Sequence, residues 1–195
     1  MKYLTEKEEK HLLKTVSEVK GKKAERDWMI LFLGFNTGLR CSELVGLNVA
    51  DVRGRDKLYV RPETAKRSKT RMIPLSKKLV SAIRNFIKLK LTWREGIQDD
   101  APLFISKRGN RLSKRQFEEA FECWCLRAGL TRYNAGEKKA LYTVHSMRHS
   151  FAKRLLQRGY SIQHVQKLLG HSSLASTGIY TEVDDEELQE AVNAL

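Results

Sequence analysis

Apolar residues recur at helical spacing along most of the chain. Thr5 and Glu8 match the pattern of a capping box, and apolar residues follow at positions 12, 13, 16 and 19. Residues 27–35 are apolar on nearly all sides, which predicts a buried central helix that ends at Gly38. A short helix capped by Ser42 should follow. Further helices are predicted after Ser76 and Ser113 and over residues 146–158, 161–169, 175–180 and 184–194.

The spacing changes between residues 57 and 75, where two short runs have the composition of β-strands. Residues 57–60 and 71–75 flank a polar, basic turn at 63–70, which predicts a small antiparallel hairpin. Residues 132–139 are polar and include Gly136, so we expect a loop there. The pattern therefore predicts a single α+β domain that is mainly α with a small antiparallel β-sheet.

Charge is distributed unevenly along the chain of 195 residues, whose formal net charge is +14. Residues 181–195 contain six acids and no base, so residues 1–180 carry 37 Lys and Arg against 17 Asp and Glu, a net charge of +20. A field of this size favours a polyanionic partner, and nucleic acid is the first candidate. The alternative is a surface whose charge only keeps the protein in solution.

Cysteine usage and hydropathy bear on the cellular compartment. Cys41, Cys123 and Cys125 form no C-x-x-C pair, and we expect all three to be reduced packing residues. No apolar run approaches the roughly 18–20 residues of a membrane span, and the N-terminus lacks a signal-peptide core. These features predict a cytoplasmic protein without membrane contact.

The residues between Thr143 and Tyr180 include several histidines and arginines but no carboxylate. His145, Arg148 and His171 precede the phenol of Tyr180, and this set of donors suits a negatively charged oxygen. His145 and His149 have the spacing of a zinc-binding pair, but no Glu follows His145 as in H-E-x-x-H.

A further arginine stands earlier in the chain. Arg40 falls at the junction between the central helix and the short helix after it, where a guanidinium can be held as a phosphate clamp. The alternative is a simple ion pair with Glu43.

Taken in order, these motifs resemble a known family. The segments T-G-L-R-C-S-E-L, H-S-M-R-H and L-L-G-H-S-S, the hairpin lysine and a tyrosine nine residues after His171 occur in one sequence. The set resembles the catalytic domain of the tyrosine recombinases, the phage-integrase family, over residues 3–181. The resemblance implies the DNA breaking-rejoining enzyme fold and a site-specific recombinase or integrase of a bacterium, archaeon, phage or mobile element.

The resemblance also implies a role for each motif residue. Tyr180 would be the nucleophile that attacks a DNA phosphate, giving a 3′-phosphotyrosyl link and a free 5′-hydroxyl. Arg40 and Arg148 would hold the non-bridging oxygens. The reaction needs neither metal nor ATP, because the covalent intermediate conserves the bond energy, so no cofactor is expected.

The remaining roles concern proton transfer and support. His171 would donate to the phosphate, and His145 would assist proton movement at the attacking tyrosine. Lys66 would protonate the departing 5′-oxygen, with Lys69 as the alternative on the same hairpin. Glu43 would support the site without reacting.

The resemblance further implies a domain organisation and partners. Residues 1–181 would be the catalytic domain, and residues 182–195 an acidic helical tail that docks on a neighbouring protomer. The N-terminal core-binding domain of the family is expected to be absent. Double-stranded DNA would be the partner, with self-association into a tetrameric synapse when full length. A type IB topoisomerase and a DNA-binding module without catalysis are the alternatives, and the compact L-L-G-H-S-S…Tyr arrangement and the acidic tail favour the recombinase.

Overall fold

The central helix α2 (Lys22–Thr37) organises the molecule. In the computed structural model, which describes residues 2–61, 70–134 and 137–170, every residue of α2 from Met29 to Phe35 is buried. The predicted buried central helix is therefore confirmed, but it begins at Lys22, within the basic tract that precedes the apolar run. It ends at Gly38, whose φ of 63° is left-handed and whose N–H donates to the carbonyl of Gly34.

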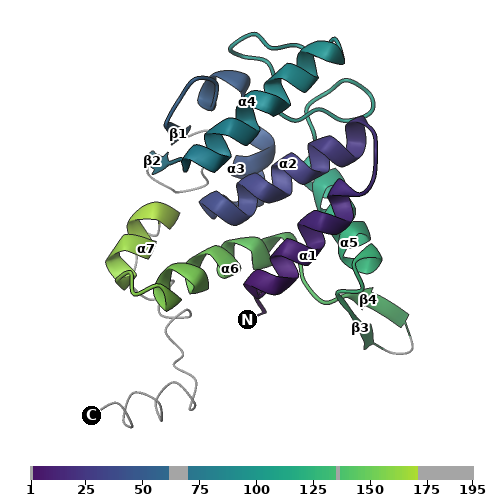
Figure 1. Cartoon of the computed structure of the whole chain (residues 1–195), viewed down its shortest axis with the longest axis vertical. Helices are drawn as coiled ribbons and strands as arrows, with labels where there is room; N and C mark the ends of the chain where they lie inside the picture. The colour runs from purple at the N-terminus through teal and green to yellow at the C-terminus, as the bar shows by residue number, and fades with distance from the viewer. Residues whose placement is uncertain (1, 62–69, 135–136, 171–195) are drawn as a thin grey trace.

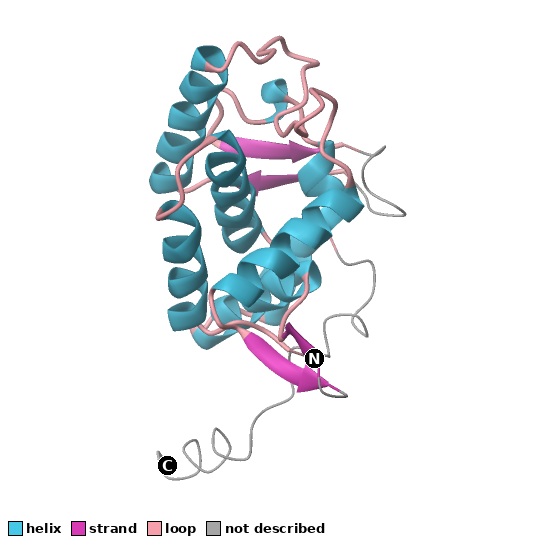
Figure 2. Ribbon diagram, turned by 90° about the vertical axis from the view of Figure 1, so that its right-hand side faces the viewer, coloured by secondary structure: helices cyan, strands magenta, loops and turns pink. Residues whose placement is uncertain are grey.

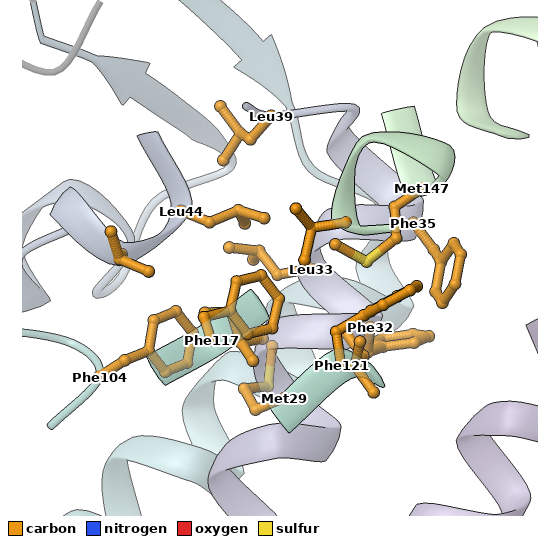
Figure 3. Packing of buried hydrophobic residues seen from close by; sticks show 14 of the residues in the cluster. Met29, Phe32, Leu33, Phe35, Leu39, Leu44, Phe104, Phe117, Phe121 and Met147 are labelled. Carbon is orange, nitrogen blue, oxygen red and sulfur yellow. The ribbon is translucent and has the colours of Figure 1, made fainter. Parts of the chain in front are cut away.

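Helices from the whole length of the chain surround α2 (Figure 1). The helices α1 (Glu6–Ser17), α4 (Lys77–Thr92) and α6 (Val144–Gln157) pack against α2, while α5 (Lys114–Arg127) contacts α1 and α3 (Cys41–Gly46). Their apolar side chains meet in one core, in which Phe117 and Phe121 of α5 lie beside Met29 and Leu33 of α2 (Figure 3). This core fixes the position of the α2–α3 turn, where Arg40 stands.

The helix ends follow the predicted capping residues in most places. The Thr5–Glu8 capping box forms, and Ser76 and Ser113 accept from the backbone N–H groups of Leu79 and Gln116. The first turn of α3 differs from the prediction. Its N-cap is Arg40 rather than Ser42, and the carboxylate of Glu43 accepts from the backbone N–H of Arg40. The helix α6 begins at Val144, two residues earlier than predicted.

Two antiparallel hairpins lie at different ends of the molecule (Figure 2). The predicted one pairs β1 (Lys57–Val60) with β2 (Arg71–Pro74). The 3-10 helix η1 (Val49–Asp51) lies between α3 and this hairpin in the chain. The second pairs β3 (Thr131–Asn134) with β4 (Glu137–Ala140), so the loop expected over 132–139 was wrong. Backbone pairing and contact of β4 with α5 stabilise this hairpin without an apolar alternation.

A short helix, α7 (Ile162–Leu169), lies between α6 and β2 (Figure 1). Its buried residues Val165 and Leu169 join Phe151 and Ala152 of α6 in a second, smaller apolar cluster. The helices predicted over 175–180 and 184–194 lie outside the described residues. Cys41 and Cys125 are buried, but Cys123 is exposed on α5, so it is not the packing residue that we expected.

The first residues of the chain are held against α6. Leu4 is buried, and its backbone N–H donates to Oγ of Ser150 at 2.8 Å. None of the helices in the described part of the chain is both long and apolar enough to cross a membrane.

Candidate active site

Arg40 stands at the start of α3, immediately after the left-handed turn at Gly38. Its side chain is 30% exposed, and its Nη1 lies 3.2 Å from Oε1 of Glu43. Its backbone N–H donates to Oε2 of the same carboxylate at 2.8 Å. The guanidinium is therefore restrained by Glu43 while part of it faces solvent. Of the two alternatives that the sequence left open for Arg40, the structure shows the ion pair with Glu43, and the phosphate clamp stays a prediction.

Glu43 is a buried anion surrounded by arginines. Its side chain is 1% exposed, and it accepts two hydrogen bonds from Arg71, from Nη1 at 2.9 Å and from Nη2 at 2.8 Å. Burial by itself would raise the pKa of Glu43, but the hydrogen bonds and charge of Arg71, followed by those of Arg40, lower it below its usual value. The carboxylate is thus ionised at neutral pH and forms ion pairs with two guanidiniums.

Arg148 is buried on the inner face of α6. Its Nη1 donates to the carbonyl of Gly38 at 2.7 Å, and its Nη2 donates to the carbonyl of Leu169 at 2.8 Å. These two bonds join the turn before Arg40 to the end of α7. Because both carbonyls belong to rigid backbone, they fix the plane of the guanidinium.

The two histidines of the H-S-M-R-H segment have different surroundings. His145 is exposed in the first turn of α6, and His149 is half-buried one turn later. Burial, then the charges of His145 and Arg148, lower the pKa of His149 to about 4. His149 is therefore neutral at physiological pH and adds no positive charge beside Arg148.

The end of α7 is the third part of the site. The carbonyl of Leu168 accepts from Nε of Arg71 at 2.9 Å, next to the bond from Arg148 to Leu169. Gly170 closes the helix with a φ of 67°. In the sequence the next residue is His171.

Sequence reasoning missed Arg71, which was treated only as a member of the basic hairpin. The signal was available in the alternation of β2, where Arg71 and Ile73 are buried and Met72 and Pro74 are exposed. An arginine at the inward position of a strand is uncommon unless it is paired, and here it is paired with Glu43.

The structure brings Arg40, Glu43 and Arg148 together around the Gly38 turn and places His145 on α6. Lys66, His171 and Tyr180 lie outside the described residues. Within residues 2–61, 70–134 and 137–170, no three His, Cys, Asp or Glu side chains are grouped so that they could hold a metal ion. The cationic side chains that are described suit a phosphate oxygen.

Comparisons with known proteins identify the family to which the sequence is similar. The model of the phage integrase family matches residues 2–187. The chain is 39% identical over 192 residues to tyrosine recombinase XerC of Caldanaerobacter subterraneus subsp. tengcongensis, covering 98% of this chain and 50% of that protein. It thus spans about half the length of this curated relative.

Two solved structures have a similar fold. The crystal structure of XerA recombinase superposes with a TM-score of 0.78 at 30% identity, covering all of this chain and 65% of that one. XerH recombinase, in a post-cleavage complex with its difH DNA substrate, gives 0.76 at 25% identity, covering 97% and 52%. The match to the family model covers nearly the whole sequence. The chain therefore belongs to the phage integrase family, the tyrosine recombinases.

Proposed function

We propose that this chain is the catalytic domain of a site-specific DNA recombinase that cleaves and rejoins strands through a 3′-phosphotyrosyl intermediate. The observation that carries the proposal is the placement of Arg40 and Arg148. Arg40 follows the Gly38 turn, and Arg148 donates to the carbonyl of Gly38. Two arginines from distant parts of the sequence are therefore held at the same turn, which supports their proposed role as two ligands of a single phosphate.

The proposed reaction is a transesterification at one phosphodiester. The phenolic oxygen of Tyr180 forms a bond to phosphorus, and the bond from phosphorus to the 5′-oxygen breaks. His145 takes the phenolic proton, and Lys66 supplies a proton to the 5′-oxygen as it leaves. In the rejoining step the 5′-hydroxyl attacks phosphorus and Tyr180 leaves, so no bond energy is lost and no ATP is needed.

Charge stabilisation is the main contribution of the arginines. The pentacoordinate transition state carries more negative charge than the phosphodiester, and Arg40, Arg148 and His171 donate to its oxygens. Each donor fixed in this way contributes on the order of 10²–10³ in rate. A positioned general acid such as Lys66 adds roughly 10²–10⁴.

Duplex DNA is the proposed substrate and partner. The net charge of +20 over residues 1–180 supports it, as does the relationship to XerH, whose solved complexes contain difH DNA. We also propose that residues 1–181 form the catalytic domain and that the acidic residues 182–195 bind a neighbouring protomer on DNA. The synaptic assembly of the longer protein would then be a tetramer.

A suicide substrate tests the proposed chemistry. The substrate is a pool of nicked duplexes with randomised sequence, in which the nick lets the short cleaved strand diffuse away and so prevents rejoining. The pool is incubated with the protein in EDTA, and the products are resolved on denaturing gels. We expect a covalent protein–DNA adduct with the wild type and none with Tyr180→Phe. An adduct that persists in Tyr180→Phe would show that another residue is the nucleophile. A wild type that binds the pool but forms no adduct on any sequence would count against the proposal.

A further inference from the structure

Arg71 makes contacts that none of the proposed catalytic roles explains. Its side chain is 6% exposed. Nη1 and Nη2 donate to the two oxygens of Glu43, and Nε donates to the carbonyl of Leu168. The guanidinium of Arg71 therefore joins three elements. Arg71 itself belongs to β2, Glu43 to α3 and Leu168 to the last turn of α7.

The backbone at the end of α7 rests directly on the Arg71 side chain. A Cβ added at Gly170 would lie 2.9 Å from Cδ of Arg71 and 3.2 Å from its Nη1. The glycine is therefore required both by its left-handed φ and by this contact. The position of Arg71 and the path of the chain at Gly170 thus depend on each other.

Arg71 and Arg148 together cap the last turn of α7. The carbonyls of Leu168 and Leu169 have no partner within the helix, and each accepts from one of the two guanidiniums. Positive charge at a helix C-terminus is also favoured by the helix dipole. Arg71 differs from Arg148 because it is in addition bonded to Glu43, which in turn holds Arg40.

A continuous series of hydrogen bonds thus runs from Arg40 through Glu43 and Arg71 to Leu168. We propose that Arg71 is a positioning residue of the strand-cleavage reaction, which sets the distance between the Arg40 turn and the end of α7. This inference rests on the proposed function, since it assigns Arg71 a part in the same reaction. Arg71 itself does not contact the phosphate.

The shape of the guanidinium is what this role requires. Arginine presents its donors in a rigid fork and can bond a carboxylate through two nitrogens while the third bonds a carbonyl. A lysine in its place keeps the charge beside Glu43 but cannot reproduce all three bonds. The variant Arg71→Lys therefore separates positioning from charge balance, and Arg71→Gln removes both.

The chain offers a matched control at Arg26. Both arginines are buried, and both bond a carboxylate and one distant backbone carbonyl. In Arg26 the partners are Asp27 and the carbonyl of Ile105, near the start of α2, whereas the site lies at the end of this helix. Arg26→Lys should therefore cost similar stability without altering the Arg40 turn or α7.

The test compares wild type, Arg71→Lys, Arg71→Gln and Arg26→Lys in the full 195-residue chain. The probe is the nicked duplex that the wild type enriches as an adduct from the randomised pool. Single-turnover adduct formation is measured at saturating protein, together with the protein concentration that half-saturates the duplex. Hydrogen exchange of the peptide covering residues 162–170 and thermal unfolding are measured on the same samples.

For Arg71→Lys we expect adduct formation to slow by about 10- to 100-fold at saturation, because a displacement of about 1 Å at a reacting group has effects of this size. The half-saturating concentration should stay within about 3-fold of the wild type, and exchange of residues 162–170 should be faster than in Arg26→Lys. Arg71→Gln should show the same changes with lower thermal stability.

Two results would overturn the inference. Adduct formation in Arg71→Lys at the wild-type rate would mean that charge alone is needed at this position. Equal slowing in Arg26→Lys and Arg71→Lys would mean that only general stability is lost. If the wild type itself forms no adduct, the proposed function fails. The hydrogen exchange of residues 162–170 then decides separately whether Arg71 holds the end of α7. Exchange in Arg71→Lys equal to that in the wild type would show that it does not.

Discussion

At the scale of single residues, buried charge organises the site. Arg148, Arg71 and Glu43 are all buried, and each is bonded to charged or backbone groups from a different element. Breaking one partner of such a pair typically costs about 3–5 kcal/mol, because a charge is left buried without its counterion. These three side chains are therefore held in place before any substrate is bound, which is the condition for electrostatic catalysis.

The neutral state of His149 has a measurable consequence for stability against pH. The pKa of His149 in the folded protein is about 4, below the ordinary value of 6.5 for a histidine. As pH falls through 6.5 the unfolded chain takes up a proton at this ring, while the folded protein does so only near 4. The contribution of His149 to the free energy of unfolding is therefore lost progressively between pH 6.5 and 4.

The variant His149→Gln tests this. As pH falls from 7 to 4.5, the free energy of unfolding of the wild type should decrease more than that of His149→Gln. Urea denaturation at several pH values measures both. Burial raises the pKa of Glu9 to about 7, so Glu9 changes the free energy of unfolding with pH in the opposite direction. Glu9 is present in both proteins, and its effect cancels in the difference. His164→Gln, at an exposed ring on α7, is the control. A difference that is independent of pH would contradict the prediction.

At the scale of elements, the apolar spacing was sufficient to predict most helices but not the features that make up the site. The capping residues Thr5, Ser76 and Ser113 were visible because their partners are local. The β3–β4 hairpin was missed because β4 has the sequence E-K-K-A, and its pairing depends on the end of α5 rather than on its own pattern.

The candidate site was predicted from the ordered motifs, and its supporting contacts were not. The residues Arg40, Glu43, His145 and Arg148 could be named from spacing and from the resemblance to the family. The contacts of Arg71 with Leu168 and of Arg148 with Gly38 join segments that are far apart in sequence. Such contacts follow from tertiary packing, which no local pattern contains.

The turn between α2 and α3 gives a prediction for an element. A Cβ at Gly38 would lie 2.5 Å from Cδ1 of Phe151 and 2.7 Å from Cδ2 of Leu169, and its φ is 63°. The left-handed backbone costs a non-glycine residue about 1–2 kcal/mol, and overpacking adds about 1–3 kcal/mol. Gly38→Ala should therefore lower the free energy of unfolding by about 2–5 kcal/mol in urea denaturation.

Gly54 provides the matched control for this substitution. Its φ is 67°, yet a Cβ there would meet nothing within 4 Å. Gly54→Ala should cost only the backbone contribution of about 1–2 kcal/mol. Equal losses in the two variants would show that the contact of Gly38 with α6 and α7 contributes nothing.

At the scale of the whole molecule, charge is separated along the chain. Deleting residues 182–195 removes six acids and no base and raises the net charge from +14 to +20. Because non-specific DNA affinity depends on phosphate neutralisation and counterion release, the truncated chain should bind a random duplex more tightly at low salt. We expect an increase on the order of 10-fold at 50 mM salt that diminishes at 200 mM, measured by fluorescence anisotropy.

The control keeps the length and removes the charge. A chain in which the six acids after Thr181 are replaced by their amides has the same net charge as the truncated one. The two should bind DNA alike if the effect is electrostatic. Identical affinity of all three chains at 50 mM salt would show that the acidic residues do not act on DNA binding.

The anchoring of Leu4 beside α6 has a consequence for protein engineering. The backbone N–H of Leu4 is bonded to Ser150 of α6, the helix that carries Arg148. The linker to a module fused before Met1 would therefore start next to this helix. The reach of a flexible linker grows only as about 5–6 Å times the square root of its length. Linker length would then set the effective concentration of the fused module at the bound duplex, in the millimolar range for short linkers. Residues 1–4 are therefore a poor place to shorten and a well-defined place to extend.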